Sequence, residues 1–235
     1  MDQVRFRFPL PSYLSLPMST NGPHRDQPVR TGGAALDDAQ AAMILLHGRG
    51  ASARGMLRLA DALDVPGVAH LAPQAAMRSW YPQSFTAPRE QNEPELASAL
   101  QVVTDTIENV QATGLGPERV VLLGFSQGAC LATTYAAENP QPYGGVVGLS
   151  GGLIGPEGTP FEYDGSLDGT PVFLGCSDRD PYIPLERVQE TDDVLRAMDA
   201  EVTTRIYEGL GHTTNEDELQ HVRTLLRRCI DRHEA

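Results

Sequence analysis

Short apolar runs alternate along the chain with segments of helical character, and this alternation limits the fold more than any other feature of the sequence. The runs are apolar at most positions, which is typical of strands in a parallel sheet that is covered on both faces. Alternating strands and helices form βαβ units. The sequence therefore predicts the α/β class, with a doubly wound, mostly parallel sheet and helices on both faces. The expected strands are 41–46, 67–72, 119–123, 144–150, 170–175 and 201–208, and the expected helices are 52–63, 93–114, 127–138, 184–200 and 215–230.

The chain has 235 residues and no internal repeat, which fits one large domain with a sizeable core. Its first residues contain apolar groups interrupted by prolines and no clear signal-peptide cleavage site. We expect residues 1–30 to form a disordered or extended N-terminal tail, with Met18 as an alternative translation start, and residues 31–235 to form a single domain. The glycine- and proline-rich stretch 151–170 is predicted to be a long loop, either a lid or a surface crossing.

Composition excludes several classes of protein. The net charge of −13 argues against binding to nucleic acid or to an anionic membrane. No apolar stretch reaches the length of a membrane span, so we expect no stable membrane insertion. Three cysteines without regular spacing do not form a disulfide framework, and reduced thiols are typical of a cytoplasmic protein. All eighteen cationic side chains are arginine, which fits either a GC-rich genome or adaptation to salt.

Two serines match the pattern G-x-S-x-G, Ser126 in "GFSQG" and Ser150 in "GLSGG". Both follow an expected strand, but only Ser126 precedes a sequence that can form a helix. Strand, sharp turn and helix together are the setting in which this pattern carries a nucleophile. We therefore expect Ser126 to be the nucleophile, with its flanking glycines making room for the turn.

A serine hydroxyl needs a base to accept its proton, and in a fold of this kind the order along the chain is serine, acid, histidine. His212 fits the base, because it lies in a glycine-containing loop between the last expected strand and the last expected helix. Asp178 and Asp180 both follow the expected strand 170–175, and the residues alone do not decide between them. Backbone N–H groups for a developing oxyanion are expected from Gln127 and from the loop "HGRG" at 47–50.

Four motifs in this order, "LLHGRG", "GFSQGA", "GCSDRDPYIP" and "YEGLGH", resemble the phospholipase/carboxylesterase family of α/β-hydrolases, which includes the acyl-protein thioesterases. The resemblance runs from about residue 40 to the C-terminus. It implies an α/β-hydrolase fold and a catalytic triad of Ser126, Asp180 and His212, with Asp180 chosen by the string D-x-x-[IV]-P. It also implies that the backbone N–H groups of Arg49 and Gln127 form the oxyanion hole. Arg49 departs from the leucine often found there.

The segment "SWYPQSFTAPREQ" at 79–91 resembles one that borders the acyl pocket in bacterial members of this family. The resemblance places three aromatic residues, Trp80, Tyr81 and Phe85, near the substrate. Ordinary core packing explains aromatic side chains equally well.

The expected function is that of a serine carboxylesterase, which hydrolyses small or medium acyl esters through an acyl-enzyme intermediate. An acyl thioesterase or lysophospholipase with the same triad is the alternative, and a non-catalytic binding protein of the same fold is a third. The expected binding partner is a small-molecule ester substrate, and the sequence does not decide whether the protein forms a homodimer. We expect neither a cofactor nor a metal, because the sequence has no H-E-x-x-H motif and no cysteine–histidine cluster at zinc spacing.

Overall fold

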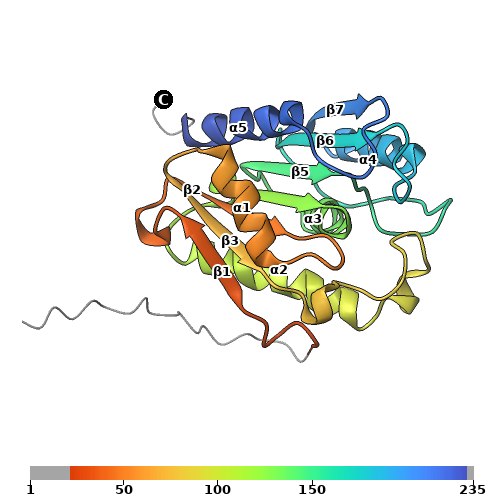
Figure 1. Ribbon diagram of the computed structural model, residues 1–235, viewed down its shortest axis with the longest axis horizontal. Helices are drawn as coiled ribbons and strands as arrows, with labels where there is room; N and C mark the ends of the chain where they lie inside the picture. The colour runs from red at the N-terminus through yellow and green to blue at the C-terminus, as the bar shows by residue number, and fades with distance from the viewer. Residues whose placement is uncertain (1–21, 232–235) are drawn as a thin grey trace, which may run out of the picture.

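The computed structural model describes residues 22–231, and its centre is a seven-stranded sheet with the order β1-β3-β2-β4-β5-β6-β7 (Figure 1). All neighbouring strands are parallel except β1, which pairs antiparallel with β3. This confirms the predicted mostly parallel α/β sheet. The strands are β1 (Val29–Gly33), β2 (Ala41–Leu46), β3 (Val68–Pro73), β4 (Val120–Phe125), β5 (Gly145–Leu149), β6 (Pro171–Ser177) and β7 (Glu201–Tyr207).

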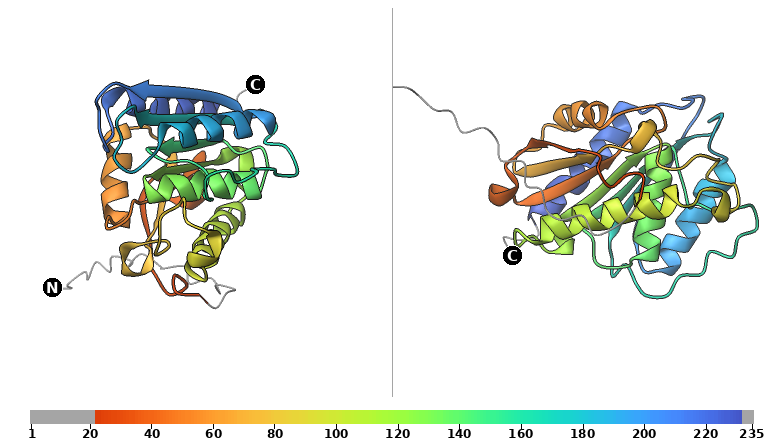
Figure 2. Two further views of the ribbon diagram at one scale, coloured as in Figure 1. Left: turned by 90° about the vertical axis from the view of Figure 1, so that its right-hand side faces the viewer. Right: turned by 90° about the horizontal axis from the view of Figure 1, so that it is seen from below.

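Within residues 22–231, α1 to α4 lie between strands and α5 follows β7, and these helices cover both faces of the sheet (Figures 1 and 2). Buried side chains of α1 and α5 form one core with one face of the sheet, and buried side chains of α2, α3 and α4 form a second core with the other face. The doubly wound arrangement was predicted correctly, and the element ends differ from the prediction by at most three residues. The helices are α1 (Ala53–Leu63), α2 (Glu95–Gln111), α3 (Gln127–Glu138), α4 (Leu185–Ala197) and α5 (Glu216–Asp231).

Strand β1 and the turn before it were missed by the sequence analysis. Val29–Gly33 form an edge strand, and the side chain of His24 is only 1% exposed. The prediction that the tail extends to residue 30 is therefore wrong for residues 22–30, while residues 1–21 lie outside the described part. The strand was missed because it follows Pro28, contains two glycines and exposes most of its side chains, so it lacks a continuous apolar run.

The 151–170 loop is held down at its start. Residues 151–155 are buried, and the guanidinium of Arg187 on α4 donates hydrogen bonds to the carbonyl oxygens of Leu153 (2.8 Å) and Gly155 (2.7 Å). The backbone N–H of Ile154 donates to the hydroxyl of Thr134 on α3 at 3.0 Å. This part of the loop is thus a packed crossing between helices. Separately, no described helix is long and apolar enough to cross a membrane.

Candidate active site

Ser126 stands at the sharp turn between β4 and α3. Its backbone has φ 55° and ψ −122°, a region that residues with a side chain seldom occupy, and its N–H donates to the carbonyl oxygen of Leu149 at 2.9 Å. A Cβ at Gly124 would collide with the backbone of Gly128, and a Cβ at Gly128 would collide with the carbonyl oxygen of Leu46. Glycine is therefore required on both sides of the turn, for the reason expected from the sequence.

Three side chains from distant loops meet at the carboxyl edge of the sheet. His212, after β7, places its Nε2 at 2.9 Å from Ser126 Oγ. Asp180, after β6, places its Oδ2 at 2.7 Å from His212 Nδ1. The Asp180 side chain is 0% exposed and that of His212 17%, so the carboxylate is shielded from solvent, while the imidazole and Ser126 are partly exposed. This geometry lets Nδ1–H donate to the carboxylate while Nε2 accepts the serine proton.

The structure separates the two candidate acids. Asp180 contacts His212 with one carboxylate oxygen, and the other accepts the backbone N–H groups of Tyr182 (2.9 Å) and Ile183 (3.1 Å), which fixes its orientation. Asp178 instead accepts the backbone N–H of Gly209 at 2.7 Å. Asp178 thus fastens the loop that carries the histidine and does not touch the imidazole.

A reciprocal cap at the start of α5 fixes the other end of the His212 loop. The carboxylate of Glu218 accepts the backbone N–H of Asn215 at 2.8 Å, and Asn215 Oδ1 accepts the backbone N–H of Glu218 at 3.0 Å. Glu218 is fully buried, and a Cβ at Gly175 of β6 would collide with its second carboxylate oxygen. Burial raises the pKa of Glu218 to about 7, and the charge of Asp217 adds to this.

The backbone N–H groups of Arg49 and Gln127 make no hydrogen bond within the described part of the chain. Gln127 is the first residue of α3, so its N–H belongs to the unpaired donors of a helix N-terminus. Gly48, next to Arg49, lies against Ser126: a Cβ at Gly48 would be 3.2 Å from the Cβ of the serine. The loop that carries Arg49 and the N-terminus of α3 therefore both lie beside Ser126.

Residues 79–83, which we call the wall segment, are attached to α3 by the side chain of Gln127. The Gln127 side chain is buried; its Oε1 accepts the backbone N–H of Trp80 at 2.9 Å, and its Nε2 donates to the carbonyl oxygen of Tyr81 at 2.8 Å. The guanidinium of Arg49 binds the next two residues, donating to the carbonyl oxygens of Pro82 (2.7 Å) and Gln83 (2.6 Å). This use of both side chains was not predicted, because the sequence pattern concerns only their backbone N–H groups.

The three aromatic residues expected near the substrate lie in the core. Trp80 is 0% exposed, Tyr81 2% and Phe85 7%. The indole N–H of Trp80 donates to the carbonyl oxygen of His47 at 2.8 Å, and the guanidinium of Arg187 lies 5.7 Å from the ring centre of Phe85. Their burial fits the alternative of core packing, and their place beside an acyl pocket stays a prediction.

Two buried histidines support the site from behind. His47 accepts the backbone N–H of Ala75 at Nε2 (3.1 Å), and its Nδ1 lies 2.8 Å from the carbonyl oxygen of Gly48. His24 accepts the backbone N–H of Ala76 at Nδ1 (3.0 Å), and its Nε2 lies 2.9 Å from the carbonyl oxygen of Trp80. Burial lowers the pKa of both imidazoles, which favours the neutral form that can donate and accept at once. No sequence signal marked His24.

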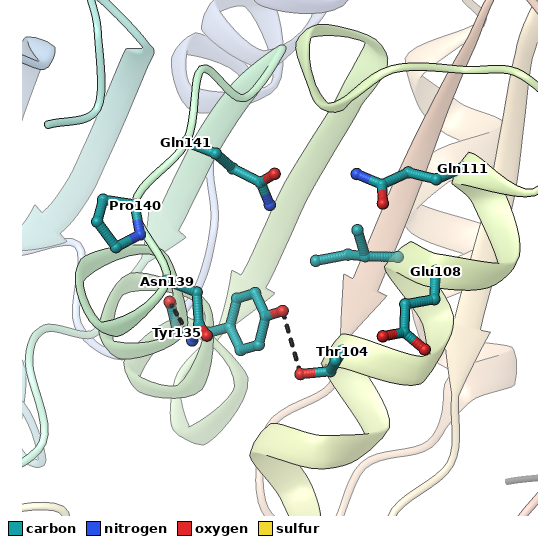
Figure 3. Close-up of a pocket in the computed structure, with 8 residues that line it drawn as sticks. Thr104, Glu108, Gln111, Tyr135, Asn139, Pro140 and Gln141 are labelled. Atoms are coloured by element: carbon teal, nitrogen blue, oxygen red, sulfur yellow. Dashed lines mark hydrogen bonds between the residues drawn. The ribbon is translucent and has the colours of Figure 1, made fainter. Parts of the chain in front are cut away.

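A separate hollow lies between α2 and the end of α3 (Figure 3). Its lining comes from Thr104, Ile107, Glu108, Gln111, Tyr135, Asn139, Pro140 and Gln141. None of these residues belongs to the serine–histidine–aspartate arrangement. Among residues 22–231, no group of three histidine, cysteine, aspartate or glutamate side chains is placed to hold a metal ion.

The sheet topology and the strand–serine–helix turn define the α/β-hydrolase class. Within that class the chain belongs to the phospholipase/carboxylesterase family, whose model matches residues 34–230. This confirms the predicted family, and the predicted class of enzyme, an ester hydrolase, is confirmed with it.

Several known proteins are similar to this chain. Acyl-protein thioesterase 1 of Kluyveromyces lactis is 27% identical over 82% of this chain and 93% of its own length. The Saccharomyces cerevisiae protein of the same name is 29% identical, but the match spans only 57% of this chain and 60% of the yeast protein. The crystal structure of a phospholipase/carboxylesterase from Dyadobacter fermentans is 40% identical, with a TM-score of 0.82 over 86% of this chain and 97% of that one.

Proposed function

We propose that this protein is a serine carboxylesterase that hydrolyses small or medium acyl esters through an acyl-enzyme intermediate. The proposal depends above all on one observation, the continuous hydrogen-bonded chain from Asp180 through His212 to Ser126, with distances of 2.7 and 2.9 Å. Such a chain gives the serine hydroxyl a base that is itself held in the correct tautomer. The family match and the names of the relatives support the reaction class.

In the proposed first step, Ser126 Oγ attacks the ester carbonyl carbon while its proton moves to His212 Nε2. Asp180 holds the imidazole and stabilises the positive charge that forms on it. The carbonyl oxygen becomes an oxyanion, which accepts hydrogen bonds from the free backbone N–H groups of Arg49 and Gln127. The intermediate then expels the alcohol, which takes the proton from His212, and leaves the acyl group on Ser126.

In the second step, a water molecule gives its proton to His212 and attacks the acyl carbon. The second tetrahedral intermediate is stabilised by the same N–H groups and releases the carboxylic acid. Ser126 recovers its proton from His212, so the enzyme returns to its initial state. Every proton transfer in both steps uses the same imidazole nitrogen, Nε2 of His212, which lies 2.9 Å from Ser126 Oγ.

The test is hydrolysis of p-nitrophenyl esters by the purified protein, together with labelling by a fluorophosphonate probe. The wild-type chain should release p-nitrophenol with an initial burst and should be labelled at Ser126. A binding protein without an activated serine, the expected third alternative, would give neither signal. Absence of both signals from correctly folded protein would refute the proposal.

A thioester substrate is the second candidate, because relatives over both partial and nearly complete lengths are named acyl-protein thioesterases. The triad would act on a thioester by the same steps, with a thiol as the leaving group. A panel of oxygen esters and thioesters with matched acyl chains separates the two. A kcat/KM for thioesters far above that for the matched esters would assign the protein to the thioesterases.

A further inference from the structure

Arg49 contributes to the site twice, through its backbone and through its side chain. Its backbone N–H is free and stands beside the serine turn, while its guanidinium donates to the carbonyl oxygens of Pro82 and Gln83 in the wall segment. The side chain is exposed and forms no ion pair with any carboxylate among the described residues. Its strongest contacts are therefore the two carbonyl groups and the face of Tyr81, whose ring centre is 6.0 Å away.

The neighbours of Arg49 are held by hydrogen bonds of their own; the N–H of Ala51, for example, donates to the carbonyl oxygen of Gly48 at 3.0 Å. Arg49 itself has no hydrogen bond at its backbone N–H within the described residues. It is flanked by Gly48 and Gly50, and glycine has the largest conformational freedom of any residue. Gly50 has φ +76° and donates its N–H to the carbonyl oxygen of Arg78 at 2.7 Å. The two hydrogen bonds from the Arg49 guanidinium link this loop to residues 82 and 83.

The second N–H donor is tied to the same segment. Gln127 holds Trp80 and Tyr81 through its side-chain amide, so four consecutive wall residues are bound by the side chains of the two residues that carry the free N–H groups. The wall segment is itself rigid, because Trp80 is fully buried and donates its indole N–H to the carbonyl oxygen of His47. The wall therefore fixes the separation of the two donors.

We propose that the Arg49 side chain is a positioning residue for the oxyanion hole, which sets the place of its own backbone N–H by binding the Pro82 and Gln83 carbonyl groups. This inference rests on the proposed function. Since the donors act on charge that develops only in the transition state, loosening them lowers kcat and leaves substrate binding nearly unchanged.

The experiment compares Arg49→Met, Arg49→Lys and a matched control, Arg54→Met, using a p-nitrophenyl ester. Methionine keeps the length and the backbone N–H but removes the fork and the charge, while lysine keeps the charge and can bind only one carbonyl group at a time. Arg54 is exposed on the first turn of α1, away from the triad and the wall segment, so its variant controls for the loss of one positive charge. Thermal melting checks that each variant is folded.

For Arg49→Met we expect kcat to fall by about 10- to 100-fold, with KM changed less than about threefold. Arg49→Lys should recover part of the loss, and Arg54→Met should match the wild type. An aliphatic trifluoromethyl ketone provides an independent readout, because serine adds to its carbonyl carbon and places an oxyanion in the hole. Its inhibition constant should rise in the Arg49→Met variant by the same factor as kcat/KM falls.

Two results would overturn the inference. One is an Arg49→Met variant with wild-type kcat; the other is a loss of kcat without any change in the affinity of the trifluoromethyl ketone. If Arg49→Met does not fold, Arg49→Lys carries the same comparison with a smaller perturbation. The proposed function fails separately, when the wild type has no esterase activity or when Ser126→Ala keeps it.

Discussion

The two glycine-flanked serines, Ser126 and Ser150, follow neighbouring strands and have similar backbones but different surroundings. Their φ angles are 55° and 51°, and each N–H donates to a carbonyl oxygen of the next strand, Leu149 for Ser126 and Gly175 for Ser150. Ser126 meets an imidazole at 2.9 Å. Ser150 is 1% exposed, and its hydroxyl lies beside the Cys176 thiol and has no oxygen or nitrogen hydrogen-bond partner among residues 22–231.

The difference between these turns teaches that backbone strain alone does not make a nucleophile. The chain after Ser126 becomes α3, which supplies a helix N-terminus, and Ser126 itself is partly exposed. The chain after Ser150 runs on as a buried loop, where a Cβ at Gly151 would contact Ala129 of α3. The turn at Ser150 therefore packs against the turn at Ser126 and the start of α3.

The largest expected effect comes from removing each hydroxyl in turn. Ser126→Ala should lower kcat for p-nitrophenyl esters by about 10⁴- to 10⁶-fold, because the acyl-enzyme can no longer form. Ser150→Ala should keep most of the activity, because its hydroxyl is buried and contacts no residue of the triad. Steady-state kinetics on both folded variants measures the contrast. Comparable losses in both would break the distinction between the two turns.

A matched pair of substitutions tests which aspartate orients the imidazole that contacts Ser126. Asp180→Asn should lower kcat by about 10³- to 10⁴-fold, because the amide favours the wrong imidazole tautomer. Asp178→Asn keeps the oxygen that accepts the Gly209 N–H and should leave kcat close to that of the wild type. The pair is matched in chemistry and lies two residues apart. A larger loss at Asp178 would transfer the acid role to that residue.

The glycine that precedes each serine by two residues tests the packing of the two turns. Gly124→Ala places a methyl group against the backbone of Gly128 and should lower the free energy of unfolding by about 3 kcal/mol or more. Gly148→Ala meets only side-chain methyl groups, of Leu174 at 3.0 Å and Thr133 at 3.1 Å, and should cost about 1 kcal/mol. Urea denaturation measures both, and equal midpoints would contradict the argument.

The smallest expected effect is on the pH dependence of stability, and it concerns Glu218. This residue lies against Gly175, whose carbonyl oxygen accepts the N–H of Ser150. Its pKa is raised from 4.5 to about 7, so the folded protein binds this proton more tightly than the unfolded chain. The contribution to stability is therefore complete below the ordinary pKa and is lost as pH rises toward the folded value. The neighbouring titratable groups are Asp217, the Cys176 thiol and Tyr207.

Glu218→Gln removes the charge, so its melting temperature relative to the wild type should rise between about pH 5 and pH 8. Thermal melts across this range measure the difference in melting temperature between the variant and the wild type. The buried histidines change stability with pH in the opposite direction, but both proteins contain them, so their effect cancels in the difference. Glu157→Gln, an exposed loop substitution, serves as the control. A difference that does not change with pH would show that Glu218 stays ionised in the folded protein.

The sequence predicted those parts of the molecule that depend on local patterns. Six strands and five helices were found because their apolar residues are continuous or recur at helical spacing. Ser126 and His212 were chosen as candidates because strand, glycine turn and helix mark the one, and the loop before the last helix marks the other. Their spatial proximity follows from the parallel sheet, in which all the strand ends meet at one edge.

The rest depends on contacts that no local pattern encodes. His24 reaches the wall segment across more than fifty residues, and the side chains of Arg49 and Gln127 bind carbonyl groups, which any residue can offer. The burial of Trp80 and Tyr81 depends on how the wall lies against α3. Periodicity indicated none of this, since each case is set by tertiary packing.

The imidazole beneath Trp80 has a practical consequence for producing the protein. Because His24 accepts from Ala76 and contacts the carbonyl oxygen of Trp80, the turn that precedes β1 belongs to the framework of the site. A clone trimmed to begin at Val29 would still encode all seven strands but would lack this support. Gene boundaries, affinity tags and cleavage scars should therefore be placed upstream of Gly22.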